Sequence, residues 1–116
     1  MHFVISREAL LKPLQLVGGV VERRQTLPVL SNVLLVLEDG ELSLTGTDLE
    51  VELVGRVKVD QSHQPGEITV PARKLLDICK SLDDDAMIEI SLADTKLTLK
   101  AGRSRFTLTT LPAAEF

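Results

Sequence analysis

The chain has 116 residues, of which 44% are hydrophobic and 3% aromatic, and its formal net charge at pH 7 is −4. This length suits one domain with an aliphatic core, no apolar run approaches the length of a membrane span, and the acidic balance argues against a DNA binder that is basic over its whole surface. The single cysteine, Cys79, excludes an internal disulfide and, with no recognisable secretory leader, favours a cytoplasmic protein.

The first part of the chain predicts a strand followed by a helix. Residues 2–6 (HFVIS) form a short apolar run, and Ser6 is a suitable N-cap for a helix that starts at the next residue. Apolar residues then recur at helical spacing and leave an opposite, polar face that includes Lys12 and Gln15. Pro13 predicts either a kink or a regular helix that begins close to it, because an interior proline removes a backbone hydrogen bond. The predicted core face consists of Leu10, Leu14, Val17 and Val21.

Three strands are predicted next. Residues 31–46 read as a hairpin, because Asp39-Gly40 is a turn signal between two apolar runs. Residues 47–59 alternate between apolar and charged side chains, which is typical of a long strand with one face in water. Residues 60–66 (DQSHQPG) read as a loop.

The same order of elements then recurs. Residues 67–70 predict a short strand, and Pro71 is well suited to open a helix over residues 72–82. This helix has an apolar stripe, and Arg73 and Lys80 lie on its opposite face. Further strands are predicted over residues 86–92, 95–101 and 104–111.

The order strand–helix–three strands therefore occurs twice, although the two halves show no residue-level repeat. This order predicts an α+β domain: a duplicated β-α-β-β-β unit whose two helices pack on one face of antiparallel sheets. We expect the two halves to join their sheets edge to edge.

Charge is distributed unevenly between the predicted helices and strands. Residues 7–24 contain four cations and two anions, and residues 73–80 contain three cations and one anion. Each helical segment thus carries +2, so the rest of the chain must carry −8 to give the net −4. We expect a basic helical face and an acidic strand face. A basic face can bind DNA phosphates weakly without reading bases, and simple solvation of each helix is the alternative.

Residue patterns typical of enzymes are missing. The chain has no P-loop and no dinucleotide-binding fingerprint, and His2 and His63 have no ligand-like neighbours. Cys79 falls on an apolar helix stripe, where packing is its common role. We expect no catalytic residue, no metal and no cofactor. A small enzyme stays open as one hypothesis, because paired carboxylates can act in acid–base catalysis and three lie close together in the sequence: Asp48, Glu50 and Glu52.

Several long stretches resemble one known family. Residues 26–35 (TLPVLSNVLL), 44–53 (LTGTDLEVEL), 69–82 (TVPARKLLDICKSL) and 102–116 (GRSRFTLTTLPAAEF) are similar to the first domain of the bacterial DNA sliding clamps, the beta subunits of DNA polymerase III. The resemblance covers residues 1–116 in register. It implies one clamp domain, with the second and third domains absent from this chain.

The resemblance also implies a function. In this family, two chains of three domains close head to tail into a ring, with helices lining the hole and sheets forming the outer wall. The ring encircles duplex DNA and tethers the replicative polymerase. The chain would then belong to a non-catalytic processivity factor. Its partners would be double-stranded DNA and a second protomer, and the polymerase and clamp loader would bind through the full-length protein.

The resemblance further implies two sets of site residues. Arg24 and Arg73 match DNA-contacting positions of the family. Their expected companions on the inner face are Lys12, Gln15, Lys80 and Arg7.

The last strand would meet the partner protomer, because an edge strand with open backbone groups invites pairing. Phe106 and Leu108 would fill an apolar patch of that junction, although by pattern alone they could equally face the chain's own core. A protein-interaction module that uses this edge strand, without a DNA role, is the alternative function. The basic side of an ion-pair set in the junction would consist of Arg103, Arg105, Lys96 and Lys74.

Overall fold

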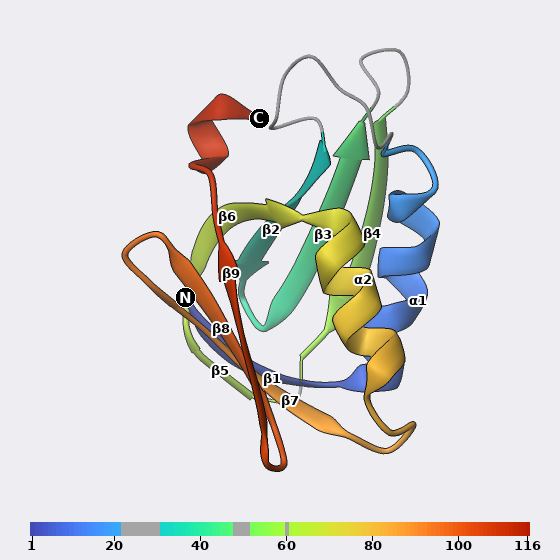
Figure 1. Ribbon diagram of the computed structural model, residues 1–116. Coiled ribbons are helices and arrows are strands. Elements are labelled where there is room, and N and C mark those ends of the chain that lie inside the picture. The colour runs from blue at the N-terminus through green and yellow to red at the C-terminus, as the bar shows by residue number, and fades with distance from the viewer. Residues whose placement is uncertain (22–30, 48–51, 60) are drawn as a thin grey trace.

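The computed structural model describes residues 1–21, 31–47, 52–59 and 61–116 (Figure 1). The order of elements predicted from the sequence is confirmed, with one additional strand. The described elements are β1 (His2–Ser6), α1 (Arg7–Gly18), β2 (Asn32–Glu38), β3 (Glu41–Thr47), β4 (Glu52–Lys58), β5 (Gln61–Gln64), β6 (Gly66–Pro71), α2 (Ala72–Ser81), β7 (Met87–Ala93), β8 (Lys96–Ala101), β9 (Ser104–Thr109) and a short 3-10 turn (Ala113–Glu115).

The strands form two antiparallel sheets, in the orders β5-β1-β7-β8-β9 and β4-β3-β2-β6. β1 of the first half pairs with β7, and β6 of the second half pairs with β2. The expectation of two halves joined simply edge to edge is therefore wrong, because each half contributes its first strand to the other half's sheet. A bridge between Thr69 of β6 and Leu111 after β9 links the two sheets. This exchange ties both halves into one folding unit.

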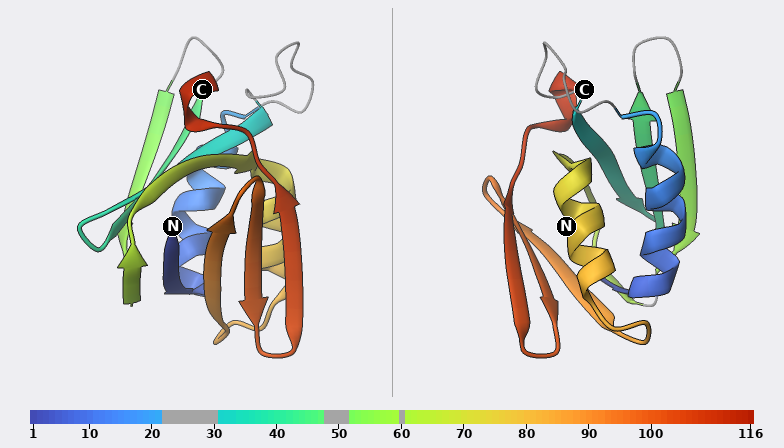
Figure 2. Two further views of the ribbon diagram at one scale, coloured as in Figure 1. Left: turned by 90° about the vertical axis from the view of Figure 1, so that its left-hand side faces the viewer. Right: turned by 45° about the vertical axis from the view of Figure 1, so that its right-hand side comes forward.

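The two helices lie next to each other, with strands of both sheets around them (Figures 1 and 2). α1 packs against α2, β3 and β4, and α2 also packs against β2 and β6. Fully buried side chains from both helices and both sheets meet in one aliphatic core, so the α+β class predicted from the sequence is confirmed. Examples from each layer are Phe3, Leu14, Leu35, Leu75 and Ile90.

The helix α1 begins where the sequence predicts. The Ser6 hydroxyl accepts a hydrogen bond from the Ala9 amide at 3.1 Å, as an N-cap does. The helix then runs through Pro13, so a start close to the proline is wrong. A Cβ added at Gly55 of β4 would lie 2.8 Å from the Pro13 Cβ. Gly55 therefore lets β4 approach the proline ring more closely than a larger residue could.

The segment between β4 and β6 differs from the prediction. Residues 60–66 were expected to form a loop, but Gln61–Gln64 forms β5, which pairs antiparallel with β1. A strand at the edge of a sheet can be polar, so it need not show the alternation of apolar residues by which strands are predicted. The sequence therefore shows no sign of β5. In β4 the predicted alternation holds over the described residues, since Leu53 and Val57 are half-buried between exposed neighbours. The earlier part of that predicted strand, residues 48–51, lies outside the described residues.

Candidate nucleic-acid interface

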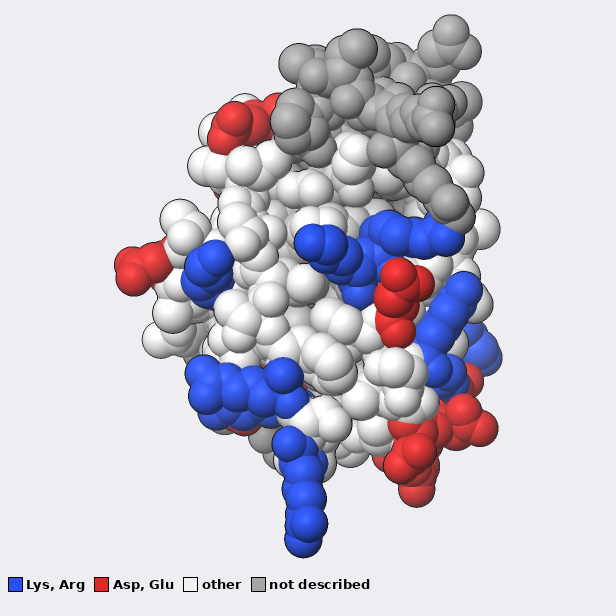
Figure 3. All heavy atoms as spheres, viewed as in Figure 1, with Lys and Arg blue, Asp and Glu red and all other residues white. Residues whose placement is uncertain are grey.

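Four of the predicted DNA-binding residues are exposed on the two adjacent helices. Lys12 and Gln15 belong to α1, and Arg73 and Lys80 belong to α2. The amphipathic spacing of both helices produces this arrangement, because Leu14 and Leu75 turn into the core and leave the polar residues outside. Figure 3 shows basic side chains spread over the surface that carries the helices. We call the exposed surface formed by Lys12, Gln15, Arg73 and Lys80 the helical face.

The cations of the helical face have no ion-pair partner in the part of the chain that the structure describes. Among the described residues, no carboxylate lies within ion-pair distance of Lys12, Arg73 or Lys80. These side chains can therefore meet phosphate groups without first breaking an internal ion pair. Such contacts contribute affinity for any duplex sequence, because phosphates carry no base information.

Arg7 is largely buried and bonded within the domain, unlike the other predicted DNA-binding residues that the structure describes. Its side chain is 12% exposed and donates from Nε to the Cys79 carbonyl oxygen at 2.9 Å. Its Nη1 donates to Asp84 Oδ1 at 3.1 Å and also contacts the Glu8 carboxylate. The guanidinium thus joins the first turn of α1 to the last turn of α2. Because Nε and Nη1 already donate to groups of the domain, Arg7 is less available to a phosphate than the exposed cations, and its place in the DNA-binding set stays a prediction.

The sequence predicts a basic helical face and an acidic strand face, but the two sheets differ in charge. The strands of the β4-β3-β2-β6 sheet carry four glutamates and two cations, whereas β1, β7, β8 and β9 carry three cations and one glutamate. The expectation of an acidic face on all strands is therefore wrong, because a sum over the chain averages two sheets of opposite sign. The exposed run Asp83–Asp85 follows α2, where Figure 3 shows acidic side chains gathered at the lower right. The exposed Asp77 lies four residues after Arg73 on α2, among these cations. The surface of the two helices therefore carries an excess of cations rather than cations alone, and it is acidic at one end.

Sequence reasoning missed Leu16 of α1. Its side chain is 58% exposed, and it follows Lys12 by four residues, so the two lie one turn apart on the same side of α1. Helical spacing alone places position 16 outside the predicted stripe of Leu10, Leu14 and Val17, which is the signal that could have identified it.

Some of the predicted residues lie outside the described residues. Arg24 is among them, and so are Asp48 and Glu50 of the hypothetical acidic enzyme site. Glu52, the third carboxylate of that site, is exposed at the start of β4.

The strand β9 lies at one edge of its sheet, with β8 as its neighbour. Leu108 is 6% exposed and belongs to the core, whereas Phe106 is half-buried and packs against it. The alternative that the chain's own core holds the apolar pair is thus correct for Leu108 and partly correct for Phe106. The predicted basic residues around this edge, Arg103, Arg105, Lys96 and Lys74, are all exposed.

Cys79 is a residue of α2, and its side chain is buried in the core. Burial raises the pKa of its thiol to about 11, against a smaller opposing effect of Arg7. The thiol is therefore protonated at neutral pH, which fits packing rather than nucleophilic chemistry. Within the described ranges, no cluster of three potential metal ligands is present, and no helix is long and apolar enough to cross a membrane.

Together, the exchanged first strands, the paired helices and the exposed cations define a class of protein: a duplicated β-α-β-β-β domain that presents a basic helical face and an open sheet edge. Known proteins share this arrangement along the whole chain. The family described as "DNA polymerase III beta subunit, N-terminal domain" matches residues 1–116.

Relatives and solved structures agree. The beta sliding clamp of Pseudomonas putida KT2440 is 74% identical over 116 residues, which is 100% of this chain and 32% of the relative. The beta sliding clamp of Escherichia coli K12 is 55% identical over 116 residues, again 100% of this chain and 32% of the relative. A Pseudomonas aeruginosa sliding clamp solved with griselimycin superposes with a TM-score of 0.98 at 74% identity, over 100% of this chain and 31% of that one. Pol III beta of Caulobacter crescentus superposes with a TM-score of 0.96 at 46% identity, over 100% of this chain and 31% of that one.

The chain belongs to the family of DNA polymerase III beta subunits and corresponds to their N-terminal domain. It spans about a third of the length of the curated relatives it matches.

Proposed function

We propose that this chain is the first domain of a sliding clamp, a processivity factor that encircles duplex DNA and tethers the replicative polymerase. The observation that carries the proposal is a set of exposed cations on two adjacent helices, none of which forms an ion pair with another described residue: Lys12, Arg73 and Lys80. Relatives that are named beta sliding clamps support it over the whole chain. The role is non-catalytic, and the protein acts in the cytoplasm.

In this proposal the helical face lies toward the DNA. Each lysine or arginine that neutralises one phosphate contributes about 0.9 to the slope of log affinity against log salt for duplex DNA. A few such contacts give weak binding, which suits a ring that must slide. Retention then comes from topology, and the tether keeps a bound polymerase at high effective concentration near the primer end. Arg24, outside the described residues, is proposed as a further DNA contact.

The open edge of β9 is the proposed junction with a second protomer in a head-to-tail ring. Strand addition there would satisfy the open backbone groups of β9. Phe106 offers the accessible apolar contact, while the exposed basic residues Arg103, Arg105, Lys96 and Lys74 face acidic groups of the partner. Charged pairs at such a junction fix its register more than they increase its affinity. The polymerase and the clamp loader are proposed to bind the full-length protein.

The test of the DNA contact is a salt titration. The chain is titrated with a fluorescent 20-base-pair duplex at several low salt concentrations, and the slope of log affinity against log salt is measured. The double variant Lys12→Ala with Arg73→Ala should lower the magnitude of the slope by about 1.8, since two phosphate contacts are lost.

The matched control is Lys58→Ala with Lys100→Ala, which removes the same charge from exposed positions on β4 and β8. Its slope should stay close to that of the unaltered chain. An equal decrease of the slope in both double variants would contradict the proposal that DNA binds specifically at the helical face. No measurable association with DNA at any salt concentration would favour the interaction module without a DNA role.

A further inference from the structure

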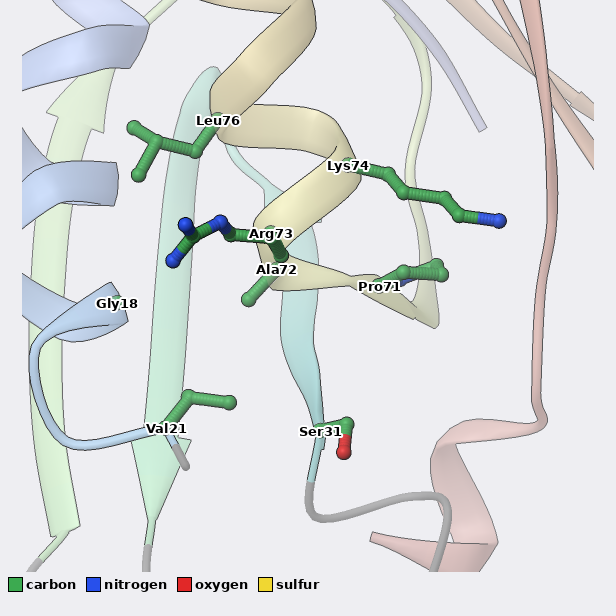
Figure 4. A pocket seen from close by; sticks show the side chains of 8 residues that line it. All are labelled: Gly18, Val21, Ser31, Pro71, Ala72, Arg73, Lys74 and Leu76. Atoms are coloured by element: carbon green, nitrogen blue, oxygen red, sulfur yellow. The ribbon is translucent and has the colours of Figure 1, made fainter. Parts of the chain in front are cut away.

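A pocket of about 340 Å³ lies between the C-terminal end of α1 and the N-terminal end of α2 (Figure 4). Its walls are largely apolar and include Val21, Pro71, Ala72 and Leu76. Small-molecule sites in proteins typically enclose roughly 300–1,000 Å³ and combine apolar walls with a few polar groups. The pocket therefore has the size and lining of a site for a small organic molecule.

The polar groups of this pocket are mainly cationic. Figure 4 shows Arg73 extending from α2 toward α1, whereas Lys74 extends to the other side of α2. Neither side chain has a carboxylate within ion-pair distance among the described residues. The helix α2 begins here without a side-chain cap. The partial positive charge of its N-terminal end therefore adds to the positive charge of Arg73 and Lys74. An apolar cavity whose rim carries a guanidinium with no ion-pair partner among the described residues is complementary to a small organic anion.

We propose that this pocket binds a small aromatic carboxylate, with the ring system against Val21 and Leu76 and the carboxylate on Arg73. Apolar burial would supply most of the affinity, and the guanidinium would orient the anion through charge-assisted hydrogen bonds. The proposal rests on the cavity and its lining, and it shares Arg73 with the proposed DNA contact.

The test is an NMR titration of the isotopically labelled chain with 2-naphthoate. We expect amide shifts that cluster on residues 16–21 and 71–76, with a dissociation constant on the order of 1 mM for a ligand of this size. The neutral analogue 2-naphthalenemethanol should bind about tenfold more weakly, because it lacks the charge-assisted contact with Arg73.

Two variants separate the apolar and ionic contributions. Gly18 lines the pocket, and a Cβ added there meets nothing within 4 Å, so Gly18→Phe should fill the pocket without a backbone clash and abolish binding of 2-naphthoate. Arg73→Ala should weaken 2-naphthoate about tenfold and leave 2-naphthalenemethanol unchanged. Lys100→Ala, an exposed cation on β8, is the control and should change neither affinity.

The proposal is overturned if 2-naphthoate binds the Gly18→Phe variant as well as the unaltered chain, or if the shifts cluster elsewhere. Equal affinities for the acid and the alcohol would overturn the assignment of an anionic ligand. Because Arg73 is exposed, its replacement keeps the test valid even if Gly18→Phe fails to fold.

Discussion

Arg7 shows how one residue can determine the geometry of the helical face without belonging to it. Its guanidinium is 12% exposed and binds the Cys79 carbonyl and Asp84, so it fixes the start of α1 against the end of α2. In the sequence it looks like one more cation of a basic helix. Its internal role depends on a partner 72 residues away, and helical periodicity contains no information about such a distant contact.

Arg7→Ala should destabilise the chain. Removing the side chain leaves the Cys79 carbonyl without this donor, and losing hydrogen bonds of a largely buried charged group costs about 1–3 kcal/mol. The measurement is urea unfolding, with the free energy extrapolated to water. Asp84→Ala is the control, because its side chain is 93% exposed and exposed ion pairs contribute less than about 1 kcal/mol. An Arg7→Ala variant as stable as the unaltered chain would refute the structural role.

At the scale of elements, β9 combines a core residue and an edge residue that sequence could not separate. In antiparallel register, Leu108 lies opposite Leu97 and Phe106 opposite Leu99. Both residues therefore have the same alternation and the same apolar neighbours. Only the packing of helices and sheets buries Leu108 and leaves Phe106 half-exposed.

The two residues should respond differently to truncation. Leu108→Ala should lower the free energy of unfolding of the chain by about 2–5 kcal/mol, as for other buried leucines. Phe106→Ala should act mainly on assembly in a hybrid clamp, in which this chain replaces the matching 116 residues of the Pseudomonas putida relative. We expect its dimer dissociation constant, measured by sedimentation, to rise about tenfold or more.

The control for the hybrid is Met87→Ala, which removes another exposed apolar side chain from β7, away from the edge. Its dimer dissociation constant should not change. If Phe106→Ala also leaves it unchanged, β9 is not the junction between protomers.

Other elements show what sequence patterns can predict. Caps, turns and apolar periodicity are local, so Ser6, Asp39-Gly40 and the stripe of α2 gave the correct order of helices and strands. Pairing between strands is not local. The exchange of β1 and β6 between halves, and the pairing of the polar β5 with β1, follow from packing of the whole chain.

At the scale of the whole molecule, the arrangement of charge is the central feature. A chain with a net charge of −4 presents exposed cations on two adjacent helices, and these cations have no ion-pair partner among the described residues, while one of its sheets is acidic. Net charge alone argued against a DNA binder that is basic over its whole surface, and only the assignment of charges to elements predicted the helical face. The opposite signs of the two sheets required the topology, because strands that are distant in sequence share each sheet.

The most direct measurement of the central claim is site-specific crosslinking of the hybrid clamp to DNA. A photoreactive group is attached to Gln15→Cys on α1 or to Glu67→Cys on β6, both of which are exposed positions. Burial raises the pKa of Cys79 to about 11, so at pH 7 this native thiol should stay unmodified and the label should report only the chosen site. With a linear duplex threaded through the ring, our account predicts crosslinks from position 15 and few from position 67. Equal crosslinking from both positions, or crosslinks from position 67 alone, would contradict it.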